Sequence, residues 1–478
     1  MKALGLLLAL AITAGCAPSV VWLGHSPDRR HHLEVLESAG KQRVRVDGVD
    51  GVEYLGIGIE SIVWSADGRR LAYPARREKG WSLVVDGQAG PVFEGLGEVA
   101  LSPDGGHVAY AAARGGAWFV VLDGEPGPAF DAILEGTLLF GHGGRFAYVA
   151  RQNASVRAVV DGAAGPLYDG IGALRFSEDG AAVAHVGRRG EEAFFWMNGR
   201  ESPPAEAIAY HALAPRGGRF AYVAKREGKW RVTVDGAESA PYARISEVSF
   251  SEDGAHVVYA GGRPDGEVIV LDDEEGPPYD EIAPGSLVFG DAGQKLSYAA
   301  RRGRGWHVVV NGEEGPAYDA VDRPVLARRG STFGYVAASR GARFVVLDGR
   351  EQRPFAWAGD LVLSADGRYH AYLADDGERM HVVHDGVPTP FDSVIAGTLV
   401  HAEEGPSWAC LVVDRAARRL FIVIDGAKKR ALDGEELAAA MTQPRLETRA
   451  LRARDAELLR RWVAAELGIT RRPKAHAR

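Results

Sequence analysis

Histidine and carboxylate side chains are the residues of this sequence that could bind a metal ion. His31 and His32 are adjacent, but residues 33–35 continue them as a strand-like run, in which neighbours point to opposite faces. The acidic runs 272–275 and 313–314 lack the alternating spacing of a calcium loop and are typical of solvated turns. We therefore expect no metal site and no cofactor.

Motifs for nucleophilic or phosphate chemistry are missing. The sequence contains no Gly-x-Ser-x-Gly, His-Glu-x-x-His, Cys-x-x-Cys or phosphate-binding glycine loop. The other histidines that we considered for a catalytic cluster are scattered along the chain: His107, His142, His185, His211, His307, His370, His381 and His384. We expect no enzyme active site.

Basic residues gather in one class of short loop, between two strand-like runs. As a group they are the candidate basic binding face: Arg76, Arg77, Lys79, Arg188, Arg189, Lys225, Arg226, Arg301, Arg302 and Arg304. Acidic residues such as Glu178, Glu252 and Glu313 stand in the other turns. Antiparallel strands place these two classes of turn at opposite ends, so we expect one basic and one acidic face. A basic face would attract an anionic partner; the plainer interpretation is that arginine keeps exposed loops soluble.

The N-terminus reads as an export signal. Lys2 precedes an apolar run at 3–14, which is too short to span a bilayer. Residues 12–16 resemble the lipobox of bacterial lipoproteins, although Thr13 stands where that family usually has leucine. The resemblance implies removal of residues 1–15 and acylation of Cys16; the alternative is ordinary cleavage nearby, leaving a free thiol. Ala17 then implies, in a Gram-negative cell, an outer-membrane lipoprotein facing the periplasm. Cys410 has no partner for a disulfide and is expected to be buried.

A repeat determines the architecture. Asp-Gly, or a close variant such as Asn-Gly or Asp-Asp, closes a run of β-branched residues eleven times, with successive copies 37 to 40 residues apart. The copies are at residues 47, 86, 123, 161, 198, 235, 272, 311, 348, 385 and 425. Each unit has room for four short strands, as in a propeller blade. In the unit from 247 to 282, strands are expected at 248–250, 256–259, 267–271 and 276–282.

A second turn sequence, Ser-x-Asp-Gly, precedes many of the Ala-Tyr strands. With Ser102-Pro-Asp-Gly105 as its fullest instance, the chain resembles the WD-repeat-like propellers of the TolB type. The resemblance covers about 415 residues as architecture and implies a β-propeller, but no particular activity, because propellers host unrelated functions.

The expected organisation is all-β, with helix confined to the two ends. We predict a signal peptide at 1–15, five propeller units at 16–210, six at 211–433, and a helical segment with a basic tail at 434–478. Two tandem rings suit eleven units best, since rings usually close at four to eight blades; one large ring is the alternative.

Charge and histidine placement then limit the function. The sequence has 64 acidic and 56 basic residues, a net charge of −8, which gives no pull toward nucleic acid. We predict a non-catalytic scaffold, anchored to the membrane by lipid, that binds a protein or an anionic envelope polymer. The alternative is a propeller polysaccharide lyase or another carbohydrate-active enzyme, which would need clustered His, Arg and Lys in a central channel.

Overall fold

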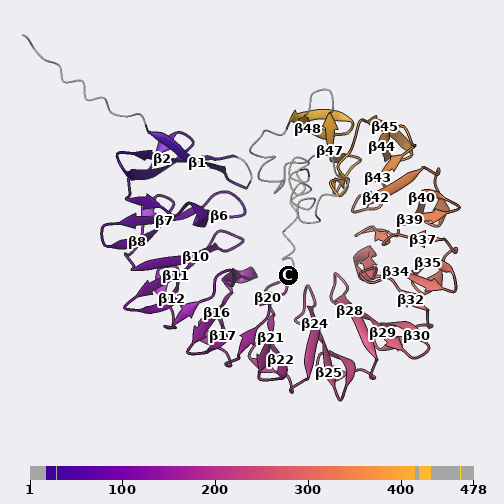
Figure 1. Cartoon of the computed structure of the whole chain (residues 1–478), viewed down its shortest axis with the longest axis horizontal. Coiled ribbons are helices and arrows are strands. Elements are labelled where there is room, and N and C mark those ends of the chain that lie inside the picture. The colour runs from indigo at the N-terminus through magenta and orange to yellow at the C-terminus, as the bar shows by residue number, and fades with distance from the viewer. Residues whose placement is uncertain (1–17, 28–29, 415–418, 432–462, 464–478) are drawn as a thin grey trace, which may run out of the picture. The chain divides into compact units, whose positions relative to one another are not determined.

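The computed structural model describes residues 18–27, 30–414, 419–431 and 463. The expected signal segment with Cys16, and all but one residue of the expected helical segment at 434–478, lie outside the described residues. The described chain forms eleven antiparallel sheets in chain order, which we call blades 1 to 11 (Figure 1). The predicted fold class, all-β with eleven four-stranded propeller repeats, is confirmed.

Five blades have a continuous first strand. Blade 1 contains β1 (Ser19–His25), β2 (His32–Ser38), β3 (Lys41–Val46) and β4 (Val49–Asp50). Blade 3 contains β10 (Gly95–Leu101), β11 (Val108–Arg114), β12 (Ala117–Leu122) and β13 (Glu125–Pro126). Blade 6 contains β24 (Ala207–Leu213), β25 (Phe220–Arg226), β26 (Lys229–Val234) and β27 (Ala237–Glu238). Blade 7 contains β28 (Arg244–Phe250), β29 (Val257–Arg263), β30 (Gly266–Leu271) and β31 (Glu274–Glu275). Blade 10 contains β42 (Trp357–Leu363), β43 (His370–Asp375), β44 (Met380–His384) and β45 (Val387–Phe391).

Five other blades have a first strand in two pieces, both paired with the second strand. Blade 2 contains β5 (Gly56–Ile57), β6 (Val63–Trp64), β7 (Leu71–Arg77), β8 (Gly80–Val85) and β9 (Gln88–Ala89). Blade 4 contains β14 (Ala132–Ile133), β15 (Leu139–Phe140), β16 (Phe146–Gln152), β17 (Ser155–Val160) and β18 (Ala163–Ala164). Blade 5 contains β19 (Gly170–Ile171), β20 (Arg175–Phe176), β21 (Val183–Arg189), β22 (Glu192–Met197) and β23 (Arg200–Glu201). Blade 8 contains β32 (Glu281–Ile282), β33 (Val288–Gly290), β34 (Lys295–Arg302), β35 (Gly305–Val310) and β36 (Glu313–Glu314). Blade 9 contains β37 (Ala320–Val321), β38 (Val325–Leu326), β39 (Phe333–Ser339), β40 (Ala342–Leu347) and β41 (Arg350–Glu351).

Blade 11 contains β46 (Val400–His401), β47 (Trp408–Asp414), β48 (Arg419–Ile424) and β49 (Ala427–Ala431). Three one-turn 3-10 helices interrupt the strands: η1 (Ile59–Ser61), η2 (His142–Gly144) and η3 (Asp291–Gly293). Within the described residues, no helix is long and apolar enough to cross a membrane.

The first strand is irregular even where it is continuous. All five continuous first strands carry a register shift in their pairing, for example between Ile245 and Val248 in blade 7. A bulge bends a strand and increases its twist. The bulged and the two-piece forms are therefore two ways of bending the same strand of the repeat.

The Asp-Gly pairs, and Asp272-Asp273 in blade 7, are the tight turns that the sequence predicts. Asp272 has φ +48°, and in blade 2 Asp86 and Gly87 have φ +50° and +81°, as a type I′ hairpin turn requires. Because the chain reverses at once, the fourth strand is short and follows the turn directly. The fourth strand expected at 276–282 is therefore wrong: the observed strand is Glu274–Glu275, and Glu281–Ile282 already opens blade 8.

The core lies in layers between consecutive blades. In one layer Val223 and Val232 of blade 6 pack with Tyr259 and Val268 of blade 7. Each of these side chains is at most 1% exposed. Cys410 belongs to the layer between blades 10 and 11 and is fully buried, which confirms the expectation for this thiol.

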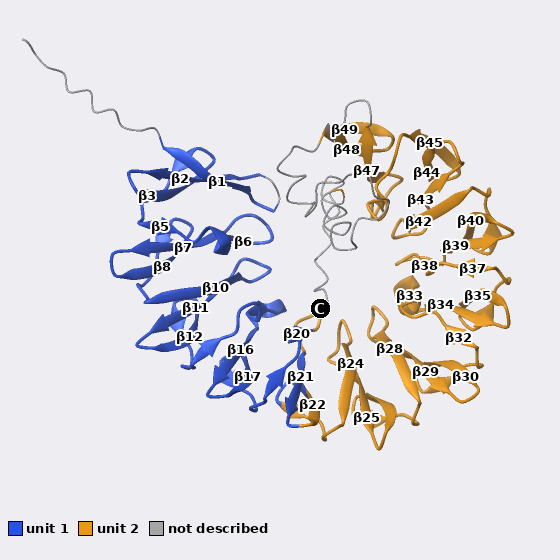
Figure 2. Ribbon diagram, viewed as in Figure 1, with its two compact units in different colours: residues 1–176, 183–190, 196–199 blue, residues 177–182, 191–195, 200–478 orange. Residues whose placement is uncertain are grey.

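The chain divides into two compact units (Figure 2). Unit 1 comprises residues 1–176, 183–190 and 196–199, and unit 2 comprises 177–182, 191–195 and 200–478. Unit 1 holds blades 1 to 4, unit 2 holds blades 6 to 11, and the boundary passes through blade 5. The division at residue 210 and the number of rings stay predictions.

Candidate functional site

A serine and an aspartate build the turn between the first and second strands. In blade 7 the Ser251 hydroxyl donates to Asp253 Oδ1 at 2.5 Å and accepts the His256 N–H at 2.9 Å. The hydroxyl bond holds the pKa of Asp253 below its usual value. The other turns with this sequence contain the same pair, at Ser65, Ser102, Ser177 and Ser364. The hydroxyl and carboxylate groups of these turns are therefore used in hydrogen bonds that stabilise the fold.

The aspartate or asparagine that opens each of the two-residue turns holds the second strand of its own blade. Asp272 Oδ1 accepts the Val257 N–H at 2.9 Å, and Oδ2 lies 2.5 Å from His256 Nδ1. At least five other blades pair this aspartate with a basic side chain in the same way, four of them through Arg70–Asp86, His107–Asp123, Arg145–Asp161 and Arg219–Asp235. His31 pairs with Asp47 at 2.6 Å. Asp272, the first residue of the acidic run 272–275, therefore has a structural role: it holds the second strand of its blade.

Two further carboxylates of the acidic runs, those of Glu275 and Glu314, also have side-chain partners. Glu275 accepts the Tyr242 hydroxyl at 2.6 Å and is paired with Arg263. Glu314 lies 3.3 Å from Arg302. Among the residues that the structure describes, no three His, Cys, Asp or Glu side chains are grouped as metal ligands.

Three histidines lie together between blades 10 and 11: His370 and His384, which stand among the scattered histidines considered above, and His401. The rings of His384 and His401 are 5.7 Å apart, and Tyr369 lies 6.4 and 6.1 Å from them. Burial lowers the pKa of His370 and of His401, and the neighbouring His384 lowers both further. His401 was not among the histidines considered above. The only sequence signal for this contact is that His401 follows Tyr369 by almost one repeat length, so that the two residues belong to neighbouring blades.

All ten residues of the candidate basic binding face lie at or beside the hairpin between the second and third strands. They are at the ends of β7, β21, β25 and β34, or, for Lys79 and Arg304, in the hairpin itself. Whether the hairpins of the whole chain share one face stays a prediction.

Six of these ten residues are engaged within their own blade or its connection. Arg77, Arg189 and Arg302 lie over the rings of Tyr54, Tyr168 and Tyr279 at 4.7 to 5.8 Å. The other three are paired with glutamates: Lys225–Glu206, Arg226–Glu238 and Arg301–Glu281. The rest, Arg76, Lys79, Arg188 and Arg304, are exposed and have no bonding partner within the described part of the chain.

The hairpin end of a blade also carries acidic side chains, which sequence analysis had placed only at the other turns. In blade 8, Asp280 follows Tyr279 and accepts the Gly303 N–H of the hairpin at 2.6 Å. The same bond occurs in five other blades, from Glu94, Asp131, Asp169, Glu206 and Asp319. The hairpin end is therefore of mixed charge.

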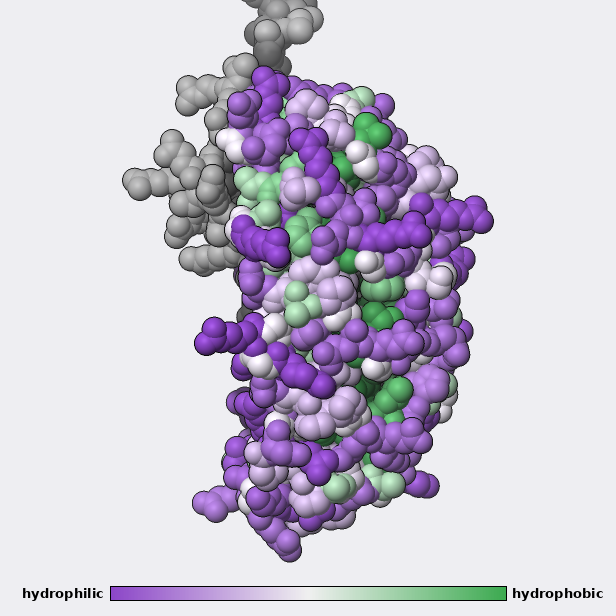
Figure 3. Space-filling view, turned by 90° about the vertical axis from the view of Figure 1, so that its right-hand side faces the viewer, coloured by the Kyte–Doolittle hydropathy of each residue, from purple (hydrophilic) through white to green (hydrophobic). Residues whose placement is uncertain are grey.

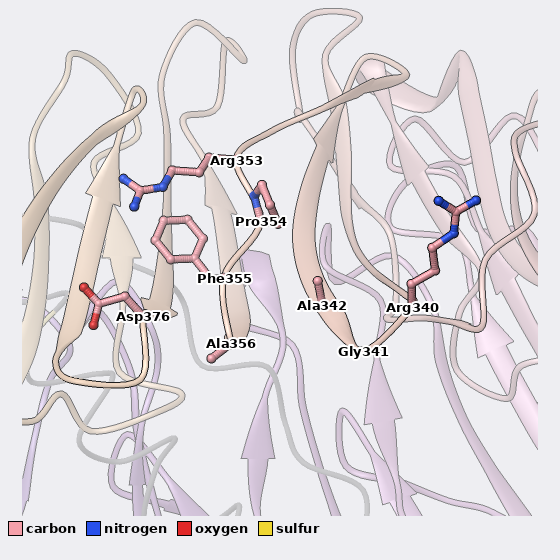
Figure 4. Close-up of a pocket in the computed structure, with 8 residues that line it drawn as sticks. All are labelled: Arg340, Gly341, Ala342, Arg353, Pro354, Phe355, Ala356 and Asp376. Atoms are coloured by element: carbon pink, nitrogen blue, oxygen red, sulfur yellow. The ribbon is translucent and has the colours of Figure 1, made fainter.

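Blade 10 departs from this pattern and leaves an open pocket of about 410 Å3 in unit 2 (Figure 4). Ala356 occupies the place of the acidic residue, and Arg353 the place of a residue that is usually proline. The Arg353 guanidinium lies 5.3 Å from the centre of the Phe355 ring. Asp376 accepts two backbone N–H groups of its own loop and is bonded to His381. Its carboxylate is thus already satisfied.

The turns between first and second strands are joined to one another in unit 2. The Arg329 N–H donates to the Ala365 carbonyl at 2.7 Å, and the Ala365 N–H to the Glu403 carbonyl at 3.2 Å. Arg328 of blade 9 reaches Glu252 of blade 7 at 2.6 Å and Glu403 of blade 11 at 3.4 Å. The Glu252 carboxylate raises the pKa of Arg328. These turns therefore form a hydrogen-bonded and ionic network rather than a purely acidic surface.

The exposed surface offers few large apolar areas. In the face of Figure 3, hydrophilic residues predominate, and apolar residues appear in small separate groups. Nine large hydrophobic side chains are exposed among the described residues, and six of them lie between Val20 and Leu55: Val20, Val21, Leu23, Val49, Val52 and Leu55.

Comparisons with known proteins give no family. No protein-family model and no curated protein matches the sequence. Among solved structures, the chain is similar to a crystal structure of the eukaryotic initiation factor, at 12% identity and a TM-score of 0.31, over 62% of this chain and 85% of that one. It is similar to the Dos1 propeller at 13% identity and a TM-score of 0.25, over 51% and 76%. Similarity to the dihydro-heme d1 dehydrogenase NirN is at 16% identity and a TM-score of 0.29, over 68% and 70%. The fold assignment here depends on the sheets themselves.

Proposed function

We propose that this protein is a lipid-anchored scaffold of the bacterial cell envelope, which binds an anionic partner through the hairpin ends of its blades without catalysis. Cys16 is the attachment point for lipid, and in a Gram-negative cell the protein faces the periplasm from the outer membrane. The partner is a protein surface or an envelope polymer that carries negative charge.

One observation carries the proposal: the polar groups of the repeat are mostly engaged with one another, whereas four hairpin cations are not. Carboxylates of the Ser-x-Asp-Gly and Asp-Gly turns hold backbone N–H groups and basic side chains. Arg76, Lys79, Arg188 and Arg304 have no such partner among the described residues. Exposed cations of this kind attract anions over a distance that salt shortens to about 8–10 Å.

The test compares two variants of equal net charge. Arg76→Ser with Arg304→Ser removes two hairpin cations, whereas Arg69→Ser with Arg368→Ser removes two exposed arginines at the opposite ends of blades. We expect only the hairpin variant to lose cross-linking to its partner in isolated envelopes and binding to an anionic polymer. Equal effects of the two variants, or turnover of a uronate polymer by the purified protein, would contradict the proposal.

The anchor has its own test. Cys16→Ser should release the protein from membranes, and mass spectrometry of the mature N-terminal peptide should show acyl chains on Cys16. Unchanged membrane association of this variant would exclude the anchor and leave the binding of the anionic partner to be judged separately.

A further inference from the structure

The first strand of blade 1 is unusually exposed for its position in the repeat. Five of the seven residues of β1 are exposed. The corresponding strands β10 and β42 contain no exposed residue, and β28 contains one. Each of those strands begins a blade that follows another described blade, whereas β1 is the first strand that the structure describes.

The exposed residues of β1 include three large apolar side chains. Val20, Val21 and Leu23 are 49%, 41% and 43% exposed, and Trp22 between them packs against the core layer of blades 1 and 2. A cluster of exposed apolar side chains in a mostly hydrophilic surface is typical of an interaction site. The chain therefore gains free energy if something apolar covers β1.

The covalent structure limits what can reach this strand. Ser19, the first residue of β1, is three positions after Cys16, and a fully extended chain covers about 3.5 Å per residue. An acylated Cys16 therefore holds the start of β1 within about 10 Å of the lipid head groups. No folded partner has to be recruited to this site, because the membrane surface is already there.

Both carboxylates beside β1 have side-chain partners, and for Glu34 the partner is a cation that offsets its charge. Glu34, which pairs with Leu23 across the sheet, lies 3.5 Å from the Arg45 guanidinium. Glu37, which pairs with Ser19, accepts the side-chain amide of Gln42 at 3.0 Å. Valine and leucine are then the groups that meet the interface, where apolar side chains are stable.

We propose that β1 is a membrane-contact strand: Val20, Val21 and Leu23 insert at the lipid–water interface and hold blade 1 against the bilayer. This inference rests on the proposed lipid anchor at Cys16. It adds a second, non-covalent contact, which orients the first blade relative to the membrane instead of leaving it on a free tether.

A fluorescent label placed on β1 tests the contact. Val21→Cys is labelled with bimane in the mature protein, because the fully buried Cys410 thiol does not react and Cys16 is acylated. The labelled protein is reconstituted into phosphatidylethanolamine–phosphatidylglycerol vesicles, with nitroxide-bearing lipid as quencher within the bilayer and iodide as quencher in water. The matched control is Val387→Cys in unit 2, which is 66% exposed.

We expect nitroxide lipid to quench the label at position 21, and the vesicles to protect it from iodide, while the label at 387 behaves in the opposite way. The Cys16→Ser protein in solution must give full iodide quenching at position 21. Equal iodide quenching of both labels in vesicles overturns the inference. Protection of position 21 without lipid also overturns it, since another part of the chain or a second copy then covers β1. Mass spectrometry separates the two proposals: an acylated protein with an accessible label refutes only the contact strand, and an unacylated one refutes both.

Discussion

Substitutions of Asp86 can distinguish three roles of the aspartate in an Asp-Gly turn: it accepts a backbone N–H, it pairs with a basic side chain, and it adopts a positive φ. Its Oδ1 accepts the Leu71 N–H at 2.9 Å, its Oδ2 accepts from Arg70 Nε at 3.0 Å, and its backbone has φ +50°. Two natural replacements already occur in the repeat: Asn198 and Asn311 keep the positive φ and accept the equivalent N–H at 3.0 and 2.8 Å.

The expected costs follow from these contacts. Asp86→Asn keeps the acceptor and the backbone conformation and loses only the half-exposed pair with Arg70, which is worth at most about 1 kcal/mol. Asp86→Ala leaves the Leu71 N–H without its acceptor, at about 1–3 kcal/mol, and adds about 1 kcal/mol for alanine at positive φ. Asp86→Gly avoids the backbone cost and should lie between the other two. The total for Asp86→Ala is about 3 kcal/mol.

Amide hydrogen exchange is the suitable assay, because a repeat protein opens locally and a single unfolding free energy averages over its blades. A loss of about 3 kcal/mol speeds exchange of the Leu71 amide about a hundredfold in Asp86→Ala, against at most about fivefold in Asp86→Asn. Amides of blade 7 serve as the internal control. If Asp86→Asn were as destabilising as Asp86→Ala, the ion pair with Arg70 rather than the backbone acceptor would hold the strand, and this reasoning would be wrong.

Three further outcomes are expected. Burial lowers the pKa of His370 and His401, so the unfolded chain binds more protons than the folded chain near pH 6. The free energy of unfolding should therefore fall as the pH drops below the usual histidine pKa of about 6.5. His401→Phe should flatten this pH dependence, as thermal unfolding can measure. Burial raises the pKa of Cys410, so a thiol reagent should modify it only at the rate of unfolding, which mass spectrometry can follow. Arg328→Ala should lower the stability of unit 2 by about 1 kcal/mol at low salt and by less at high salt, as urea unfolding can measure; a salt-independent loss would mean that Arg328 acts through packing.

The repeat could be predicted because its signals are local. Two-residue turns with positive φ need Asp, Asn or Gly, so the Asp-Gly pairs gave the period and the end of every third strand. In blade 7 the expected strand at 267–271 differs from Gly266–Leu271 by one residue. The fourth strand was misplaced because Pro277 and Tyr279 suggest an edge strand, whereas Tyr279 forms only a single bridge, with Glu267.

The contacts between blades could not be predicted in this way. Arg328 and its two glutamates are 75 and 76 residues apart, so no local pattern relates them. The histidine cluster, and the carboxylates that accept the N–H groups of the hairpins, likewise depend on which side chains of one repeat face the next. The sequence located the basic residues of the hairpins, but it showed neither the carboxylates that bond to the hairpins nor which charges are already paired.

The Asp-Gly and Asn-Gly turns also affect how this protein ages. In a flexible peptide these are the sequences most prone to succinimide formation, in which the glycine nitrogen attacks the side-chain carbonyl carbon and leaves isoaspartate. In the blades, the side-chain oxygen is held by a backbone N–H of the second strand, for instance Asn311 Oδ1 by Leu296 at 2.8 Å, and the turn is fixed at positive φ. The side chain therefore cannot turn freely toward the glycine nitrogen. The bond that closes each blade thus also protects its most labile peptide from chemical damage, and a blade that opens for long becomes a site of irreversible modification.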